Sequence, residues 1–156
     1  MPASDLEELY RDILLDHYRS PRNRGRLGAA ASCSADGANP LCGDQITLDV
    51  TVDDGRIVDI AFDGNGCSIS QASASMMTEY VKGRTVDEAR DGIEAFQRMM
   101  VEGEPLGDEY GDIEALVGVA KFPLRVKCAS LAWKTLEQAL SNDTARVAVT
   151  TDERSQ

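Results

Sequence analysis

The sequence has little positive charge and no long apolar run. Its 16 Lys and Arg residues stand against 27 Asp and Glu residues, which gives a formal net charge of −11. Proteins that bind nucleic acid usually present a basic face, and anionic membranes attract basic segments, so this balance argues against both partners. No stretch approaches the ~18 consecutive apolar residues of a membrane-spanning helix. The first residues lack the basic and apolar regions of a signal peptide, so we expect a cytoplasmic protein.

Cysteine is also scarce, and its spacing excludes two common motifs. The four cysteines are Cys33, Cys42, Cys67 and Cys128, and no two of them form a C-x-x-C pair. The sequence therefore carries neither a thioredoxin-type redox motif nor a zinc ribbon. Disulfides rarely persist in a reducing cytosol, so we expect these residues to be metal ligands, reactive thiols or plain buried side chains.

The 156 residues have the length of one domain, which can bury roughly 70% of its unfolded surface. Apolar periodicity predicts the following helices: 4–18, 68–81, 86–102 with an interruption near Gly92, a short one over 112–120, and 125–140. Alternation predicts two strands, 45–52 and 56–62, joined by a turn at Asp53-Asp54-Gly55. A further strand in the thirties is only weakly indicated.

This order of elements predicts an α+β fold, with a small antiparallel β-sheet flanked by helices. We expect one domain over residues 5–141 and a polar, loose tail over 142–156. In the second strand, Val58, Ile60 and Phe62 are expected to share one face, and the sequence Asp63-Gly64-Asn65-Gly66 is expected to end the strand.

Three cysteines and one aspartate lie where loops end or helices are predicted to begin. Cys42 and Asp44 flank a glycine, and residues two apart in an extended chain can point the same way. Cys67 and Cys128 each stand near the predicted start of a helix, where the pKa of a thiol is lowered. Zn²⁺ accepts thiolate and carboxylate ligands together. The long separations match no short metal motif, so spacing alone leaves a shared site and ordinary buried cysteines equally open.

Four segments of the chain carry a family resemblance. They are Leu15–Asn23, Asn39–Asp44, Gly64–Met77 and Arg125–Trp133. Together they resemble the U-type iron–sulfur cluster assembly proteins, a family that includes IscU, the N-terminal domain of NifU, and SufU. The resemblance extends over about residues 5–141 and implies the fold of that family.

Two departures from the IscU pattern resemble the SufU branch. Lys127 stands where IscU-type proteins have a histidine before the third cysteine, and extra sequence occupies about 98–118. The SufU resemblance implies a zinc site with the ligands Cys42, Asp44, Cys67 and Cys128. It also implies that sulfur comes from a SufS-type, pyridoxal-phosphate-dependent cysteine desulfurase and passes on to downstream Suf assembly proteins.

Within this resemblance, Cys42 is the expected persulfide thiol. The family pattern implies that Cys42 leaves zinc, that a histidine of the desulfurase takes its place, and that the freed thiolate receives the sulfur. Arg125 and Lys127 are expected to offset the negative charge of the site or to steady the persulfide anion.

Two other functions stay open. A scaffold would assemble an iron–sulfur cluster on the same thiolates and pass it on, because both chemistries use cysteine. Lys127 argues against that role, since lysine is a poor cluster ligand at neutral pH. The third function is a non-catalytic, zinc-stabilised binding module, which would accept no sulfur from a desulfurase.

The other polar and reactive residues have simpler expected roles. Cys33 is expected to be a surface or half-buried thiol. His17, the only histidine, is expected to pack against its neighbours or to cap its helix rather than bind a metal. Arg22, Arg24 and Arg26 are expected to form a solvated loop, with docking to an acidic partner as the alternative.

Overall fold

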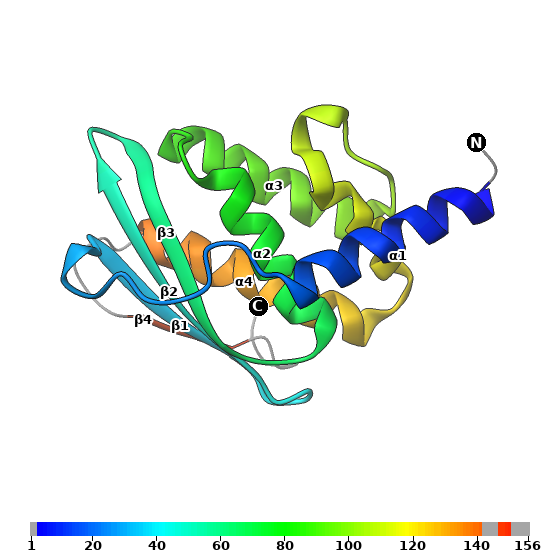
Figure 1. Cartoon of the computed structure of the whole chain (residues 1–156), viewed down its shortest axis with the longest axis horizontal. Coiled ribbons are helices and arrows are strands. Elements are labelled where there is room, and N and C mark those ends of the chain that lie inside the picture. The colour runs from blue at the N-terminus through cyan, green and yellow to red at the C-terminus, as the bar shows by residue number, and fades with distance from the viewer. Residues whose placement is uncertain (1–2, 142–146, 151–156) are drawn as a thin grey trace.

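The computed structural model describes residues 3–141 and 147–150. Its elements, in chain order, are α1 (Ala3–Arg19), the 3₁₀ turn η1 (Gly28–Ala30), β1 (Cys33–Asn39), β2 (Asp44–Asp53), β3 (Arg56–Asn65), α2 (Ser68–Val81), α3 (Val86–Glu102), the 3₁₀ segment η2 (Asp108–Lys121), α4 (Pro123–Ser141) and β4 (Val147–Thr150). One sheet holds the strands in the order β3-β2-β1-β4. The helices gather on one side of this sheet (Figure 1). The predicted α+β fold is confirmed.

The three strands β1, β2 and β3 pair antiparallel, and β4 adds to the edge of the sheet parallel to β1. The expectation of a loose tail is therefore wrong for Val147–Thr150, because this segment pairs with β1 as a strand. The other residues of the expected tail, 142–146 and 151–156, lie outside the described part of the chain.

The β2–β3 hairpin turns where the sequence predicts. Asp54 and Gly55 both have positive φ angles, 53° and 74°, as a tight two-residue hairpin turn requires. At the far end, however, β3 continues to Asn65, so the predicted break at residues 63–66 is wrong. Gly64 pairs with Ile46 and so extends the strand. Only glycine fits at this position, because a side chain would collide with the backbone of Gln45.

A bulge changes which residues of β3 face the core. The pairing register shifts between Thr51 and Val52, so that Thr51 lies opposite Asp59 while Val52 lies opposite Ile57. Val58 is the extra residue of the bulge and is 44% exposed, whereas Ile57 is buried. The expectation that Val58 shares the buried face is wrong, because a bulge interrupts the alternation of side chains.

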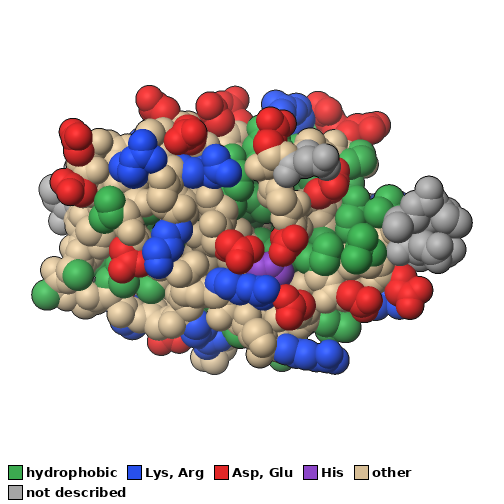
Figure 2. Space-filling model, turned by 45° about the horizontal axis from the view of Figure 1, so that its top comes forward, with side chains coloured by type: hydrophobic (Ala, Val, Ile, Leu, Met, Phe, Trp, Pro, Cys, Tyr) green, Lys and Arg blue, Asp and Glu red, His purple; other side chains and the backbone are tan. Residues whose placement is uncertain are grey.

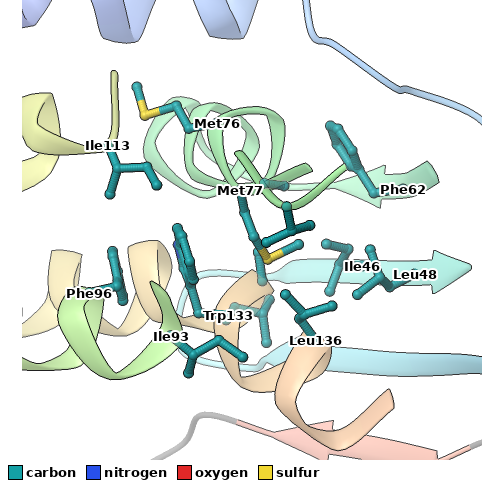
Figure 3. Close-up of a cluster of buried hydrophobic side chains, with 14 of the residues drawn as sticks. Ile46, Leu48, Phe62, Met76, Met77, Ile93, Phe96, Ile113, Trp133 and Leu136 are labelled. Carbon is teal, nitrogen blue, oxygen red and sulfur yellow. The ribbon is translucent and has the colours of Figure 1, made fainter. Parts of the chain in front are cut away.

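The core lies between the sheet and the helices. Trp133 stacks on Phe96 with ring centroids 4.6 Å apart, and its indole N–H donates to Ser73 Oγ at 3.0 Å. Figure 3 shows these two rings close to Ile93 of α3, while Met77 of α2 and Leu136 of α4 extend the cluster toward the strands. The core thus joins α2, α3 and α4 to the sheet.

Two features of the helical layer differ from expectation. Helix α3 is continuous through Gly92. This glycine allows close packing, since an added Cβ would lie 2.5 Å from Tyr80 Cε2. The segment predicted as a short helix over 112–120 is the longer 3₁₀ segment η2, which is kinked at Gly111. Among the described residues, no helix is both long and apolar enough to cross a membrane.

The segment between α1 and β1 passes along the edge of β3 and over the far face of the sheet. Gly25 N–H donates to the carbonyl of Phe62, and Phe62 N–H donates to the carbonyl of Asn23. Arg24 pairs with Asp63, and Arg26 pairs with Asp49. The expectation of a merely solvated basic loop is therefore wrong, since this loop covers the outer edge of the sheet.

Asp49 is the most heavily bonded acid of this face. It is buried and accepts hydrogen bonds from Arg26 Nε at 2.7 Å, from Ser34 Oγ at 2.6 Å and from the Leu27 N–H at 3.0 Å. Burial by itself raises the pKa of this carboxyl, but the hydrogen bonds from Arg26, Ser34 and Leu27 outweigh it and lower the pKa below its ordinary value. The carboxylate therefore fastens the loop to the sheet.

We expect Asp49→Asn to lower the free energy of unfolding at pH 7 by about 1–3 kcal/mol, because charge-assisted bonds are lost. Since the folded pKa is lowered, the stability that ionised Asp49 provides is present above the unfolded pKa of about 3.9 and is lost as the pH falls through the folded pKa. Urea denaturation at several pH values measures this difference, which should shrink below about pH 4. Asp53→Asn, at an exposed position of β2, is the control. An equal loss in both variants would contradict the assignment.

Candidate metal centre

The ends of two strands place Cys42 and Asp44. Asn39, the last residue of β1, pairs with Asp44, the first residue of β2, so residues 40–43 form a tight connection. Gly43 has a φ of 70°, a conformation that glycine adopts without strain. This connection carries Cys42 at the surface and turns Asp44 inward.

The structure brings three of the four expected ligands together. The ligand atoms of Cys42, Asp44 and Cys128 all lie within 4.8 Å of one another. Cys128 Sγ donates to Cys42 Sγ at 3.3 Å, although the two residues are far apart in the sequence. Cys42 is exposed, whereas Cys128 is 4% exposed and Asp44 is 1% exposed. The group is therefore open to solvent on the side of Cys42.

Cys67 is not part of that 4.8 Å group, but it is tied to it through Asp44. Its backbone N–H donates to Asp44 Oδ1 at 2.9 Å. Its thiol caps helix α2, where the sulfur accepts from the Ser70 N–H at 3.4 Å. The predicted placement of Cys67 at a helix start is thus seen in the structure, with the sulfur facing the positive end of the helix.

The expectation that Cys128 lies at a helix start is wrong. Helix α4 begins at Pro123, so Cys128 stands in its second turn and is buried. Burial above all, then the hydrogen bond with Cys42 and the negative charges of Cys67 and Asp44, raise the pKa of the Cys128 thiol well above its ordinary value. A buried thiolate at this position needs a cation beside it.

Asn39 is a site residue that the sequence reasoning missed. Its side chain is completely buried, and Nδ2 donates to Asp44 Oδ2 at 3.4 Å and to Cys128 Sγ at 3.7 Å. Among the described residues, its Oδ1 has no hydrogen-bond partner. The available signal was its place in the same short segment as Cys42 and Asp44. Groups that bond to metal ligands in this way orient them.

A glycine also shapes the site. An added Cβ at Gly66 would lie 2.8 Å from Asp44 Oδ1, so a larger residue would displace the carboxylate. The three sulfurs and the carboxylate form a donor set that suits tetrahedral zinc, and the three thiols alone also suit an iron–sulfur cluster. The residues present therefore fit either group.

The two expected supporting residues lie on α4 before Cys128. Arg125 is exposed, and its guanidinium carbon lies 4.8 Å from the centroid of the Phe122 ring. Lys127 directly precedes Cys128 and is half-buried. Their effect on the charge of the group stays a prediction.

Known proteins share this arrangement of sequence and fold. Residues 9–150 match the family model described as the NifU-like N terminal domain. The zinc-dependent sulfurtransferase SufU of Bacillus subtilis is 46% identical over 142 residues, which cover 90% of this chain and 95% of that protein. The iron–sulfur cluster assembly scaffold protein IscU of Streptococcus pyogenes serotype M1 is 44% identical over 142 residues, with 90% and 87% covered.

A solved structure supports the same assignment. The crystal structure of a nitrogen-fixing NifU-like protein (N-terminal) from Brucella abortus superposes with a TM-score of 0.78 at 26% identity, and covers 87% of this chain and 94% of that one. The family model spans nearly all the described elements, including the segments that carry Cys42, Cys67 and Cys128. The chain belongs to the family of NifU-like N-terminal domains.

Proposed function

We propose that this protein is a zinc-dependent sulfurtransferase of iron–sulfur cluster assembly. It would take persulfide sulfur from a SufS-type, pyridoxal-phosphate-dependent cysteine desulfurase and pass it to downstream Suf proteins. The similarity to SufU of Bacillus subtilis supports this role. The observation that carries the proposal is the difference in exposure within the candidate metal centre.

In the group formed by Cys42, Asp44 and Cys128, only the Cys42 thiol is open to a partner protein. Cys42 is exposed on a short connection, whereas Cys128 is buried in α4 and Asp44 is buried at the start of β2. A residue on such a connection moves at low cost, because few packed contacts hold it. Cys42 is therefore the ligand that the site releases most easily.

The proposed zinc ligands are Cys42, Asp44, Cys67 and Cys128. Zinc supplies a positive charge that keeps the sulfurs deprotonated at neutral pH and lowers their reactivity while they are bound. Asn39 donates hydrogen bonds toward Asp44 and Cys128, and Cys67 N–H fixes the carboxylate of Asp44. These bonds hold the three inner ligands in place when Cys42 moves.

The sulfur transfer conserves atoms and charge. The Cys42 thiolate attacks the outer sulfur of the persulfide on the desulfurase, and a new S–S bond forms on Cys42. The S–S bond of the desulfurase persulfide breaks, and its cysteine leaves as a thiolate. No external oxidant or reductant is needed. We propose that a histidine of the desulfurase takes the place of Cys42 during this step.

Two positive side chains of α4 would stabilise the persulfide anion that forms on Cys42. Arg125 lies exposed in the first turn of the helix, and Lys127 lies next to Cys128. A persulfide is more acidic than a thiol and stays an anion at neutral pH. A nearby guanidinium or ammonium group would lower the free energy of that anion.

A scaffold for an iron–sulfur cluster is the second candidate function. The thiols of Cys42, Cys67 and Cys128 would hold the cluster, and the relative from Streptococcus pyogenes is named as a scaffold protein. The metal content separates the two functions. The protein is purified without oxygen and without a metal-binding tag, and zinc, iron and acid-labile sulfide are measured per chain.

We expect about one zinc per chain, with neither iron nor sulfide, because four ligands make one closed tetrahedral site. Stoichiometric iron and sulfide would instead support the scaffold. Zinc without any sulfur acceptance from a desulfurase would support a zinc-stabilised binding module. Sulfur acceptance is measured by mass spectrometry of the protein after incubation with the desulfurase and cysteine.

We expect Cys42→Ala to abolish the stimulation of the desulfurase, so that the rate falls to that of the desulfurase alone, because the acceptor thiol is gone. Sulfide release in the presence of a reductant measures the rate. Cys33→Ala is the matched control, since Cys33 lies buried in β1 and does not belong to the group of Cys42, Asp44 and Cys128. Full stimulation by the Cys42 variant would refute the assignment of the acceptor.

We expect Asp44→Ala to weaken zinc binding at least about 10-fold, because it removes a ligand and the acceptor of the Cys67 N–H bond. The melting temperature of the zinc-loaded protein should fall by about 3 °C or more. Competition with a chelator and calorimetry measure the two effects. Asp53→Ala, on the same strand, is the control. An unchanged zinc affinity would remove Asp44 from the ligand set.

A further inference from the structure

A second group of side chains of the types that can ligate a metal lies where α1, α2 and η2 meet. His17, Glu79 and Asp112 each direct one ligand atom into it, and these atoms all lie within 4.8 Å of one another. His17 Nε2 is 2.8 Å from Asp112 Oδ2 and 3.8 Å from Glu79 Oε1. Figure 2 shows the single histidine of the chain, in purple, among acidic side chains on this face. The group contains no sulfur and lies outside the cysteine site.

The imidazole of His17 is held in one orientation. Its side chain is 0% exposed, and Nδ1 lies 2.7 Å from Ser75 Oγ. Ser75 Oγ also accepts from the Arg22 N–H at 2.8 Å, which fixes the hydroxyl. Nε2 is therefore the nitrogen that faces the two carboxylates. Histidines that bind metals are oriented in the same way, by a hydrogen bond at the other ring nitrogen.

The two carboxylates reach the group from different elements. Asp112 directly follows Gly111, whose φ of 60° and ψ of −134° kink η2. Glu79 Oε2 lies 3.7 Å from Arg22 Nε, and Arg22 also bonds to Asp16 at 2.7 Å. The Arg22 charge is thus shared between two acids, and Glu79 Oε1 faces His17 instead. Both Glu79 and Asp112 are partly exposed, so an ion can enter from solvent.

A cavity next to the group has room for water. It holds about 210 Å³ and is lined by Glu79, Asp112, Glu109, Tyr80 and Arg84, among others. The guanidinium carbon of Arg84 lies 4.2 Å from the centroid of the Tyr80 ring. Cations that prefer six ligands commonly keep several waters, and this cavity can hold them beside the three protein donors.

We propose that His17, Glu79 and Asp112 bind a divalent first-row cation of the Mn²⁺ or Fe²⁺ type. One imidazole and two carboxylates suit such ions, whereas the thiol-rich centre suits zinc. Without the ion, His17 Nε2–H donates to Asp112. With the ion, the single proton of the neutral imidazole moves through solvent from Nε2 to Nδ1, so that Nε2 ligates the cation and Nδ1–H donates to Ser75 Oγ. The earlier expectation that His17 binds no metal is replaced by this proposal.

The same contacts also fit a purely structural role, in which His17 only links α1 to η2. Titration of the zinc-loaded protein with Mn²⁺ separates the two roles, because Mn²⁺ prefers oxygen and nitrogen donors and leaves the thiol site to zinc. The electron paramagnetic resonance signal of free Mn²⁺ reports its binding. Zinc content, measured before and after, shows that the thiol site is not exchanged.

We expect the wild type to bind one Mn²⁺, and Glu79→Gln and Asp112→Asn each to weaken binding at least about 10-fold. Mn²⁺ should also raise the melting temperature of the wild type and not that of these two variants, since a ligand of the folded state stabilises it. Both substituted side chains are partly exposed, so the variants are expected to fold; a substitution of buried His17 is avoided for that reason.

Asp16→Asn is the matched control. It removes one negative charge beside the same Arg22 but leaves the three ligands intact. Binding in this variant should stay within about 3-fold of wild type, because a neighbouring exposed charge acts weakly. An absence of Mn²⁺ binding, or equal binding by wild type, Glu79→Gln and Asp112→Asn, would overturn the proposal. Equal weakening by all three variants would also overturn it and indicate a diffuse acidic surface.

Discussion

The buried carboxylate of Asp44 is the constraint on which the cysteine site depends. It begins β2, accepts a hydrogen bond from the Cys67 N–H through Oδ1, and accepts one from Asn39 Nδ2 through Oδ2. Asn39 in turn donates to the sulfur of Cys128. Asp44 thus connects the end of β1 to the start of α2, and Asn39 extends this connection to the second turn of α4. Because the carboxylate has almost no access to water, its position is set by these bonds, and Gly66 leaves the space for it.

This arrangement divides the cysteines into a fixed part and a movable part. Cys128 is fixed by the packing of α4 against the sheet, and Cys67 is fixed as the cap of α2. Cys42 has neither restraint, since it lies exposed on the β1–β2 connection. The domain core is large, with Trp133, Phe96 and Phe62 all fully buried, so we expect it to form without a metal. A metal would then stabilise the protein mainly by joining Cys42 to the fixed ligands.

Local patterns predicted the elements better than they predicted the contacts. Helix α2 begins and ends where periodicity places it, and the β2–β3 turn follows from Asp54 and Gly55. Strand β1 is weakly signalled because it consists of small residues, and Gly37 is needed where α4 approaches, since an added Cβ would meet Thr135. The bulge at Val58 and the depth of Cys128 depend on how distant elements pack, which no local pattern contains. For Asn39 the local signal was its place beside Cys42 and Asp44, but its bond to Cys128 of α4 depends on packing in the same way.

Helix α2 takes part in both ligand groups, and its length decides how strongly they influence each other. Cys67 caps its first turn, while Ser75 and Glu79 on later turns face His17. At a rise of about 1.5 Å per residue, Cys67 and Glu79 are separated by about 18 Å along the helix. That exceeds the Debye length of about 8 Å at physiological salt, so the solvent-exposed charges of the two groups are largely screened from each other. A cation at His17 would therefore reach the exposed thiol of Cys42 mainly through the packing of α2. The two groups differ in donor chemistry as well as in place, which allows a soft site and a hard site to coexist in one small domain.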